Sequence, residues 1–229
     1  MKIAMWSGPR NLSTAMMYAF GNRSDLTVWD EPFYAAYLSE TGIEHPMKEE
    51  VLATGNTNPL FVSQKIATAK RGLFLKLMSF HMCKGFPLDW AHACKHIHLI
   101  RHPARVVASY SAKRESPTLR DVGFEQQLSI YERFPGVVVD SADIRNDPEG
   151  MLRKLCATIG MKFDHSMLSW QAGPKPFDGV WAAHWYDAVH HSTGFAGPEG
   201  ALPVLEGAAA DLVGAAMPHY EALKAKAIS

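Results

Sequence analysis

Short apolar runs alternate with longer amphipathic segments along this chain, and the two kinds of run predict different elements. The apolar runs predict strands over residues 2–6, 27–30, 73–77, 96–100 and 137–139, and the first does not alternate, as expected of a strand buried on both faces. Helical spacing and composition predict helices over 15–20, 104–113, 120–134, 148–159 and 205–227. This alternation predicts an α/β fold of three layers, with a mostly parallel central sheet and helices on both faces.

The loop after the first strand is rich in small and polar residues, and it reads Ser7-Gly-Pro-Arg-Asn-Leu-Ser-Thr14. Where such a loop opens a helix, backbone N–H groups and the helix dipole attract an anion. Arg10 adds a fixed positive charge, and Ser13 and Thr14 add hydroxyl donors. The loop therefore predicts a site for a phosphate or a similar group, with a turn that binds nothing as the alternative. It has one glycine and no lysine, unlike the usual nucleoside-triphosphate loop.

A second candidate for anion binding follows the fourth predicted strand. Arg101 stands at the carboxyl end of that strand, where ligands bind in open α/β sheets. Pro103 suits the first turn of the next helix, and Ser109 lies eight residues beyond Arg101. Arg101 and Ser109 could hold a second phosphate.

Three further regions have sequence features that predict local structure or contacts. Asp147, Pro148 and Gly160 predict the start and end of one helix, as N-cap, first helical residue and residue just past the end. Residues 41–58 are polar and predict a surface insertion that could cover an acceptor. The aromatic and histidine residues of 180–195 could cover an adenine ring, line an acceptor pocket or pack on the sheet, and residues 192–194 could touch a phosphate.

Composition narrows the class of protein. The 229 residues are 47% hydrophobic and 20% charged, which predicts a single globular domain over 1–229. The formal net charge is zero, so no general attraction to nucleic acid or membrane is expected. Three cysteines give no disulfide framework and predict a cytoplasmic protein. We expect no secretion signal and no membrane span, and the sequence does not indicate the oligomeric state.

In these motifs the chain resembles the sulfotransferases that use 3′-phosphoadenosine-5′-phosphosulfate (PAPS). Pro9-Arg-Asn-Leu-Ser-Thr14 resembles their loop for the 5′-phosphosulfate, and Arg101-x-Pro103 followed by Ser109 resembles their 3′-phosphate motif. Asp30-Glu-Pro-Phe33 is similar to a segment of some bacterial and carbohydrate-directed members. The resemblance covers about residues 1–170, as the core of the domain, with an aromatic-rich part over 171–229 that packs on it.

The resemblance implies a P-loop-like, nucleotide-binding fold and a PAPS-dependent enzyme. It implies sulfuryl transfer to a hydroxyl or amine of a small-molecule or carbohydrate acceptor, without a metal. The implied donor-binding residues are Gly8, Pro9, Arg10, Asn11, Leu12, Ser13, Thr14, Arg101 and Ser109. Arg10 would stabilise charge on the transferring group, Glu31 would act as general base, and Lys76 would contact that group or the acceptor.

Several alternatives stay open at this point. Leu12 replaces the usual glycine of the phosphate loop, and Met78 stands where cytosolic members have a histidine base. Asp30 and His81 are alternative bases, Glu31 could simply begin a helix, and Lys76 could be a surface lysine. The sequence also admits a nucleotide-binding phosphotransferase or an inactive relative. A zinc site at His92, Cys94, His96 and His98 is disfavoured, because ligands two apart on a straight strand rarely converge.

Overall fold

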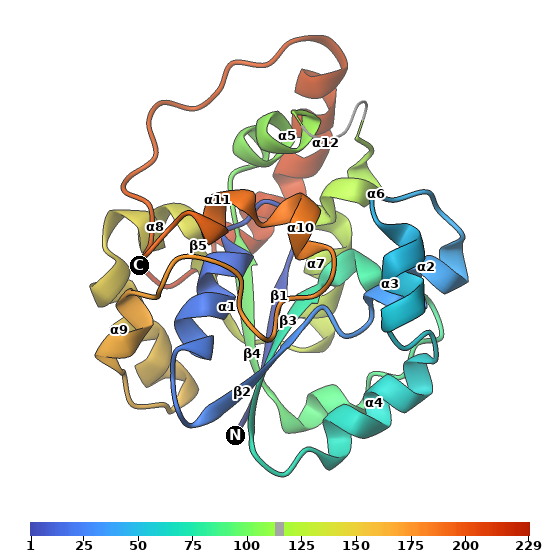
Figure 1. Cartoon of the computed structure of the whole chain (residues 1–229). Coiled ribbons are helices and arrows are strands. Elements are labelled where there is room, and N and C mark those ends of the chain that lie inside the picture. Colours follow the sequence, from blue (N-terminus) through green and yellow to red (C-terminus); the bar gives the residue numbers. More distant parts are fainter. Residues whose placement is uncertain (113–116) are drawn as a thin grey trace.

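The computed structural model describes residues 1–112 and 117–229 and confirms the α/β fold (Figure 1). Within these residues five strands form one parallel sheet in the order β2-β3-β1-β4-β5. Their carboxyl ends meet at one edge, where the predicted site residues lie. The strands are β1 (Lys2–Ser7), β2 (Leu26–Asp30), β3 (Gly72–Met78), β4 (Lys95–Ile100) and β5 (Val137–Asp140).

Helices and short 3-10 turns connect and cover the strands. Those before β4 are α1 (Ser13–Gly21), α2 (Tyr34–Thr41), α3 (Lys48–Thr54), α4 (Pro59–Thr68), η1 (Ser79–His81) and η2 (Asp89–Ala93). Those after it are α5 (Pro103–Ser111), α6 (Leu119–Val122), α7 (Phe124–Arg133), α8 (Ser141–Asn146), α9 (Pro148–Ile159), η3 (His165–Leu168), α10 (Ala182–Trp185), α11 (Asp187–His190) and α12 (Gly207–Lys224).

The central strand β1 is buried on both faces, as its unbroken apolar run predicts. Ile3 and Met5 join an apolar cluster with residues of α1 and α9, whereas Ala4 and Trp6 join a second cluster with residues of α4 and η2. Figure 1 shows α1 and α9 on one side of the strands and α4 on the other. This packing fixes the strand ends that carry the site.

The segment after the sheet packs against it. Helix α12 lies against α5 and α7, and near the end of the chain the Ile228 amide donates to the Val138 carbonyl at 2.9 Å. None of the helices within the described residues is both long enough and apolar enough to cross a membrane.

Helix α9 follows the caps that the sequence predicts. The Asp147 side chain accepts from the Gly150 amide at 2.9 Å, Pro148 is the first helical residue, and Gly160 ends the helix with a φ of 75°. These contacts satisfy backbone groups that the helix ends leave open.

One predicted helix and one predicted surface insertion differ from the structure. The single helix predicted over 120–134 is wrong, because Gly123 adopts a φ of 71° and separates α6 from α7. Residues 41–58 contain α3, whose Val51 is fully buried, so this insertion is not entirely superficial. The helix predicted over 104–113 is α5, which ends at Ser111; Lys113 lies outside the described residues.

Candidate active site

A cavity of about 300 Å³ lies at the carboxyl edge of the sheet. Most of the predicted site residues line it: Pro9, Arg10, Asn11, Leu12, Ser13, Thr14, Glu31, Lys76, Arg101 and Ser109. Gly8 is not among the lining residues. A Cβ at Gly8 would come within 2.7 Å of the Val122 carbonyl oxygen, so glycine lets the loop pass close to α6.

The loop Pro9–Thr14, which we call the phosphate loop, has an unusual backbone. Arg10 and Leu12 both adopt left-handed conformations, with φ of 59° and 71°. Such conformations turn successive backbone N–H groups toward a common concavity. Among the residues that the structure describes, no side chain caps α1, so the amides of its first turn remain available beside the cavity. The loop thus has the form of an anion cradle.

Asn11 fixes this loop to the sheet. Its side chain is almost fully buried, and its Nδ2 donates to the Leu99 carbonyl at 3.0 Å. The bond ties the loop to the neighbouring strand β4, which also carries Arg101 just beyond its end. Asn11 therefore holds the loop in place with its side chain.

Arg10, Arg101 and Ser109 meet at one side of the cavity. Arg10 Nε donates to Ser109 Oγ at 2.9 Å, and Arg101 Nη1 donates to the Arg10 carbonyl at 2.7 Å. Burial, and then the charge of Arg101, lowers the pKa of Arg10 from its ordinary value. Two guanidinium groups that repel each other in a cavity would be stabilised by an anion placed between them.

The opposite side of the cavity holds a buried ionic network of Asp30, Glu31, Lys76 and Tyr186. Lys76 is fully buried, so the alternative of a surface lysine is wrong. Asp30 lies beside Lys76 in the register of β2 and β3, and Lys76 Nζ donates to Asp30 at 3.1 Å, to Glu31, and to Tyr186 Oη at 2.7 Å. Burial opposes the charge on Lys76, but the carboxylates of Asp30 and Glu31 raise its pKa.

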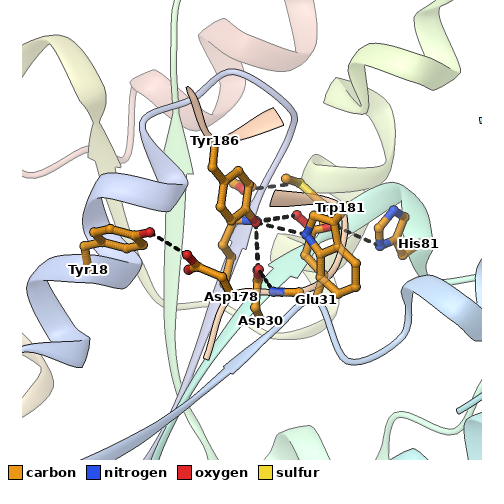
Figure 2. Close-up of polar contacts among 11 residues, drawn as sticks. Tyr18, Asp30, Glu31, His81, Asp178, Trp181 and Tyr186 are labelled. Carbon is orange, nitrogen blue, oxygen red and sulfur yellow. Dashed lines mark hydrogen bonds and ion pairs between the residues drawn. The ribbon is translucent and has the colours of Figure 1, made fainter. Parts of the chain in front are cut away.

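Tyr186 brings the C-terminal segment into this network. Figure 2 shows its hydroxyl beside Asp30, with Glu31 and Trp181 around it. Tyr186 Oη donates to Asp30 Oδ2 at 2.8 Å and accepts from Trp181 Nε1 at 3.1 Å. Its pKa lies well above the ordinary value because it is buried and faces Asp30 and Glu31. The sequence singled out 180–195 as aromatic but gave no sign of this contact with β2 and β3.

The three candidate bases differ in surroundings. Asp30 is bonded by Lys76, Tyr186 and the Gly179 amide, and it is not among the lining residues. Glu31 lines the cavity, and burial raises its pKa although Lys76 acts to lower it. Glu31 also has a left-handed φ of 39° and precedes α2 by three residues, so it does not begin that helix.

His81 also lines the cavity, three residues after Met78. Its ring stacks between Tyr34 and Tyr37, and Nδ1 lies 3.9 Å from Glu31 Oε2. Burial, with His45 and Lys76 nearby, holds the pKa of His81 well below its usual range. The imidazole is therefore neutral, and a proton on it would create a second buried cation near Lys76.

The two histidines of β4, His96 and His98, make hydrogen bonds within the protein. His96 Nδ1 accepts from Trp6 Nε1 at 3.1 Å, and its Nε2 lies 3.0 Å from the Ala91 carbonyl. His98 Nε2 lies 2.9 Å from the Phe134 carbonyl. Within residues 1–112 and 117–229, no group of three or more His, Cys, Asp or Glu side chains is placed to hold a metal ion.

The family model described as "Sulfotransferase domain" matches residues 1–227 of this chain. The chain belongs to this sulfotransferase family. Family and fold together support an enzyme of the sulfotransferase kind. Two relatives from Arabidopsis thaliana, named branched-chain-amino-acid aminotransferase-like proteins 2 and 1, are 38% and 36% identical over 86% and 97% of this chain. The chain spans only 36% and 41% of those proteins, and their names do not describe a sulfotransferase.

Solved structures show the same fold at low sequence identity. A sulfotransferase domain from the curacin biosynthetic pathway has a TM-score of 0.57 and 16% identity, over 93% of this chain and 96% of that one. A sulfotransferase from Alicyclobacillus acidocaldarius has a TM-score of 0.56 and 11% identity, over 97% of this chain and 94% of that one. These similarities support the sulfotransferase fold. The roles of individual residues are inferred from the geometry of the site.

Proposed function

We propose that this protein transfers a sulfuryl group from PAPS to a hydroxyl group of a small molecule or carbohydrate. The observation that carries the proposal is that Arg10 and Arg101 line the same cavity as Glu31. A cation for the transferring group and a carboxylate for the acceptor proton thus share one space. An amine acceptor would need the same two groups.

The phosphate loop supports binding of the donor. The free amides at the start of α1, with Ser13 and Thr14, would bind the 5′-phosphosulfate. Arg101 and Ser109 would bind the 3′-phosphate, which distinguishes PAPS from ATP. The mutual repulsion of Arg10 and Arg101 fits this use, since an anion between them would relieve it.

The ionic network supports the transfer step. The acceptor oxygen would displace the bisphosphate leaving group at sulfur, with the reacting groups in line. Arg10, which stays protonated, would stabilise the charge on the leaving oxygen rather than donate a proton. Glu31 would accept the proton of the acceptor hydroxyl. Lys76 would hold the Glu31 carboxylate in place, because its Nζ is already bonded to Asp30, Glu31 and Tyr186.

Aromatic rings line the rest of the cavity and support an acceptor with an apolar face. Tyr34, Phe80, Tyr110 and Trp185 are among the lining residues. Rings of this kind pack on a sugar ring or on an aromatic alcohol. His45, from the insertion 41–58, also lines the cavity, and this supports the proposal that the insertion covers the acceptor.

Calorimetric titration of the full chain tests the donor. Adenosine 3′,5′-bisphosphate should bind roughly 10- to 100-fold more tightly than adenosine 5′-monophosphate, because a charge-assisted contact is added. Arg101→Ala should remove that preference, while Arg153→Ala, a change on the surface of α9, should preserve it. A preference for ATP with magnesium would instead favour the phosphotransferase alternative, and no binding of any nucleotide would refute the proposal.

Transfer itself is tested by incubating the protein with PAPS and a panel of sugars and aromatic alcohols, followed by mass spectrometry. A product heavier by one sulfuryl group is expected from wild type. Glu31→Gln should lower the rate by a factor on the order of 100 to 10,000 while leaving bisphosphate binding unchanged. A Glu31→Gln variant with full activity would exclude Glu31 as the base.

A further inference from the structure

Three arginines of the described chain converge on a single carboxylate beside the cavity. Glu199 Oε1 accepts from Arg101 Nε at 3.0 Å and from Arg145 Nη1 at 2.9 Å, and Arg105 Nε lies 2.8 Å from Glu199 Oε2. The Glu199 side chain is only 4% exposed. We call Arg101, Arg105 and Arg145 the arginine cluster.

The arginine cluster is assembled from separate elements at neighbouring strand ends. Arg101 follows β4, Arg105 lies on α5, and Arg145 lies on α8, which follows β5. Arg101 also lines the cavity and bonds to the phosphate loop through the Arg10 carbonyl. The arginine cluster is therefore continuous with the proposed donor site.

The charges of this cluster do not balance. Three guanidinium groups face one carboxylate, which leaves two positive charges over. A phosphate monoester carries nearly two negative charges at neutral pH and offers three acceptor oxygens, so it matches three arginines better than a carboxylate does. The chemistry of the cluster thus suits a phosphate monoester.

Glu199 reaches the cluster from a segment with little other attachment. Residues 196–204, which we call the strap, contain no helix or strand and are mostly exposed, with Val204 90% exposed. Figure 1 shows this segment as part of the long coil between α11 and α12, outside the body of the molecule. The strap is tied down at Glu199 and at the carbonyls of Gly197 and Gly200, which accept from Arg145 and Arg105. Among the described residues the strap is therefore held mainly by polar contacts to arginines, which a stronger anion can replace, rather than by buried apolar packing.

We propose that Glu199 is an internal competitor for the phosphate site of the arginine cluster, and that a phosphate monoester on the donor displaces it. This inference rests on the proposed function, since it takes the 3′-phosphate of the donor as the displacing group. Glu199 would then lower donor affinity, and the strap would lift from the cluster when the donor binds. Arg105 and Arg145, which the sequence did not single out, would become donor contacts.

Titration of Glu199→Gln tests the competition. The variant should bind adenosine 3′,5′-bisphosphate on the order of ten-fold more tightly than wild type, because the amide cannot oppose the phosphate with a charge. Its affinity for adenosine 5′-monophosphate should stay within about two-fold, since that ligand lacks the 3′-phosphate. Glu206→Gln, at the end of the same coil, is the matched control and should change neither affinity. Arg145→Ala in the Glu199→Gln background should reverse the gain.

A second measurement follows the strap itself. Hydrogen exchange of residues 196–204 should rise when the bisphosphate binds wild type, and slower exchange on binding would overturn the displacement. Equal or weaker bisphosphate binding by Glu199→Gln would also overturn it. If neither protein binds the bisphosphate, the proposed function fails. The inference is then decided by inorganic phosphate, which should raise the melting temperature of Glu199→Gln more than that of wild type, and an equal rise would refute it.

Discussion

The two sides of the cavity are built in opposite ways. The phosphate loop side, with Arg10, Arg101 and Ser109, carries positive charge, and its two arginines repel each other. The buried ionic network on the other side sets Lys76 between two carboxylates and bonds all of them directly or through Tyr186. The phosphate loop side therefore carries positive charges that repel each other, whereas each charged group of the ionic network is bonded to a partner.

This difference predicts that one side of the cavity serves mainly to bind the ligand, and that the other also stabilises the fold. An incomplete cationic side gains most when an anionic ligand arrives, so its residues should affect binding more than folding. A satisfied network deep in the protein loses most when one partner is removed, so its residues should affect folding as well as chemistry. The comparison therefore predicts different profiles for substitutions on the two sides.

The largest expected effect is on stability, from Lys76→Met. Removing the ammonium leaves Asp30 and Glu31 buried without their common cation, and the loss in unfolding free energy should be about 3–5 kcal/mol. Arg10→Gln, the companion change on the other side, should shift stability by less than about 1 kcal/mol, because a partly buried and repelled charge is lost. Urea unfolding monitored by circular dichroism measures both. Equal losses for the two variants would contradict the comparison.

Tyr186→Phe should have an intermediate effect on stability and a distinct effect on pH dependence. Loss of the hydroxyl leaves Asp30 without one donor, at a cost of about 1–3 kcal/mol. Burial already raises the pKa of Glu31, and Tyr186 is one of the groups that act to lower it, so the substitution should raise that pKa further. Since Glu31 must be ionised to accept a proton, activity should be lost as pH falls through its pKa. The acid limb of kcat/KM should therefore move to higher pH.

The control for this change is Tyr220→Phe. Tyr220 Oη also donates to a buried carboxylate, that of Asp140, at 2.7 Å, but Tyr220 is not among the cavity-lining residues. Tyr220→Phe should lower stability by a similar amount and leave the acid limb where it is. A limb that moves in both variants, or in neither, would remove Tyr186 from the positioning of Glu31.

Local signals account for what the sequence could predict. The phosphate loop and Arg101 each follow directly from a strand, so their position at the sheet edge comes with the fold. Tyr186 and Glu199 reach the site from more than 80 residues beyond Arg101, and no periodicity links such distant positions. The break at Gly123 does not follow from the apolar stripe of Phe124, Leu128 and Tyr131, because all three residues lie on α7, beyond the glycine. One sequence feature does point to part of the arginine cluster. Arg101 and Arg105 are four residues apart at the start of a predicted helix, a spacing that places two side chains close together.

The smallest expected effect concerns the backbone of Leu12. A left-handed conformation costs a non-glycine residue roughly 1–2 kcal/mol, and Leu12 has a φ of 71°. Leu12→Gly removes that strain but loses the packing of a partly buried side chain, so the net change should stay within about 1 kcal/mol. Leu12→Ala loses the packing and keeps the strain. Alanine should thus be less stable than glycine here by about 1 kcal/mol, the reverse of their usual order near a helix. Thermal unfolding of the two variants measures the order, and the usual order would mean that the loop does not hold this conformation.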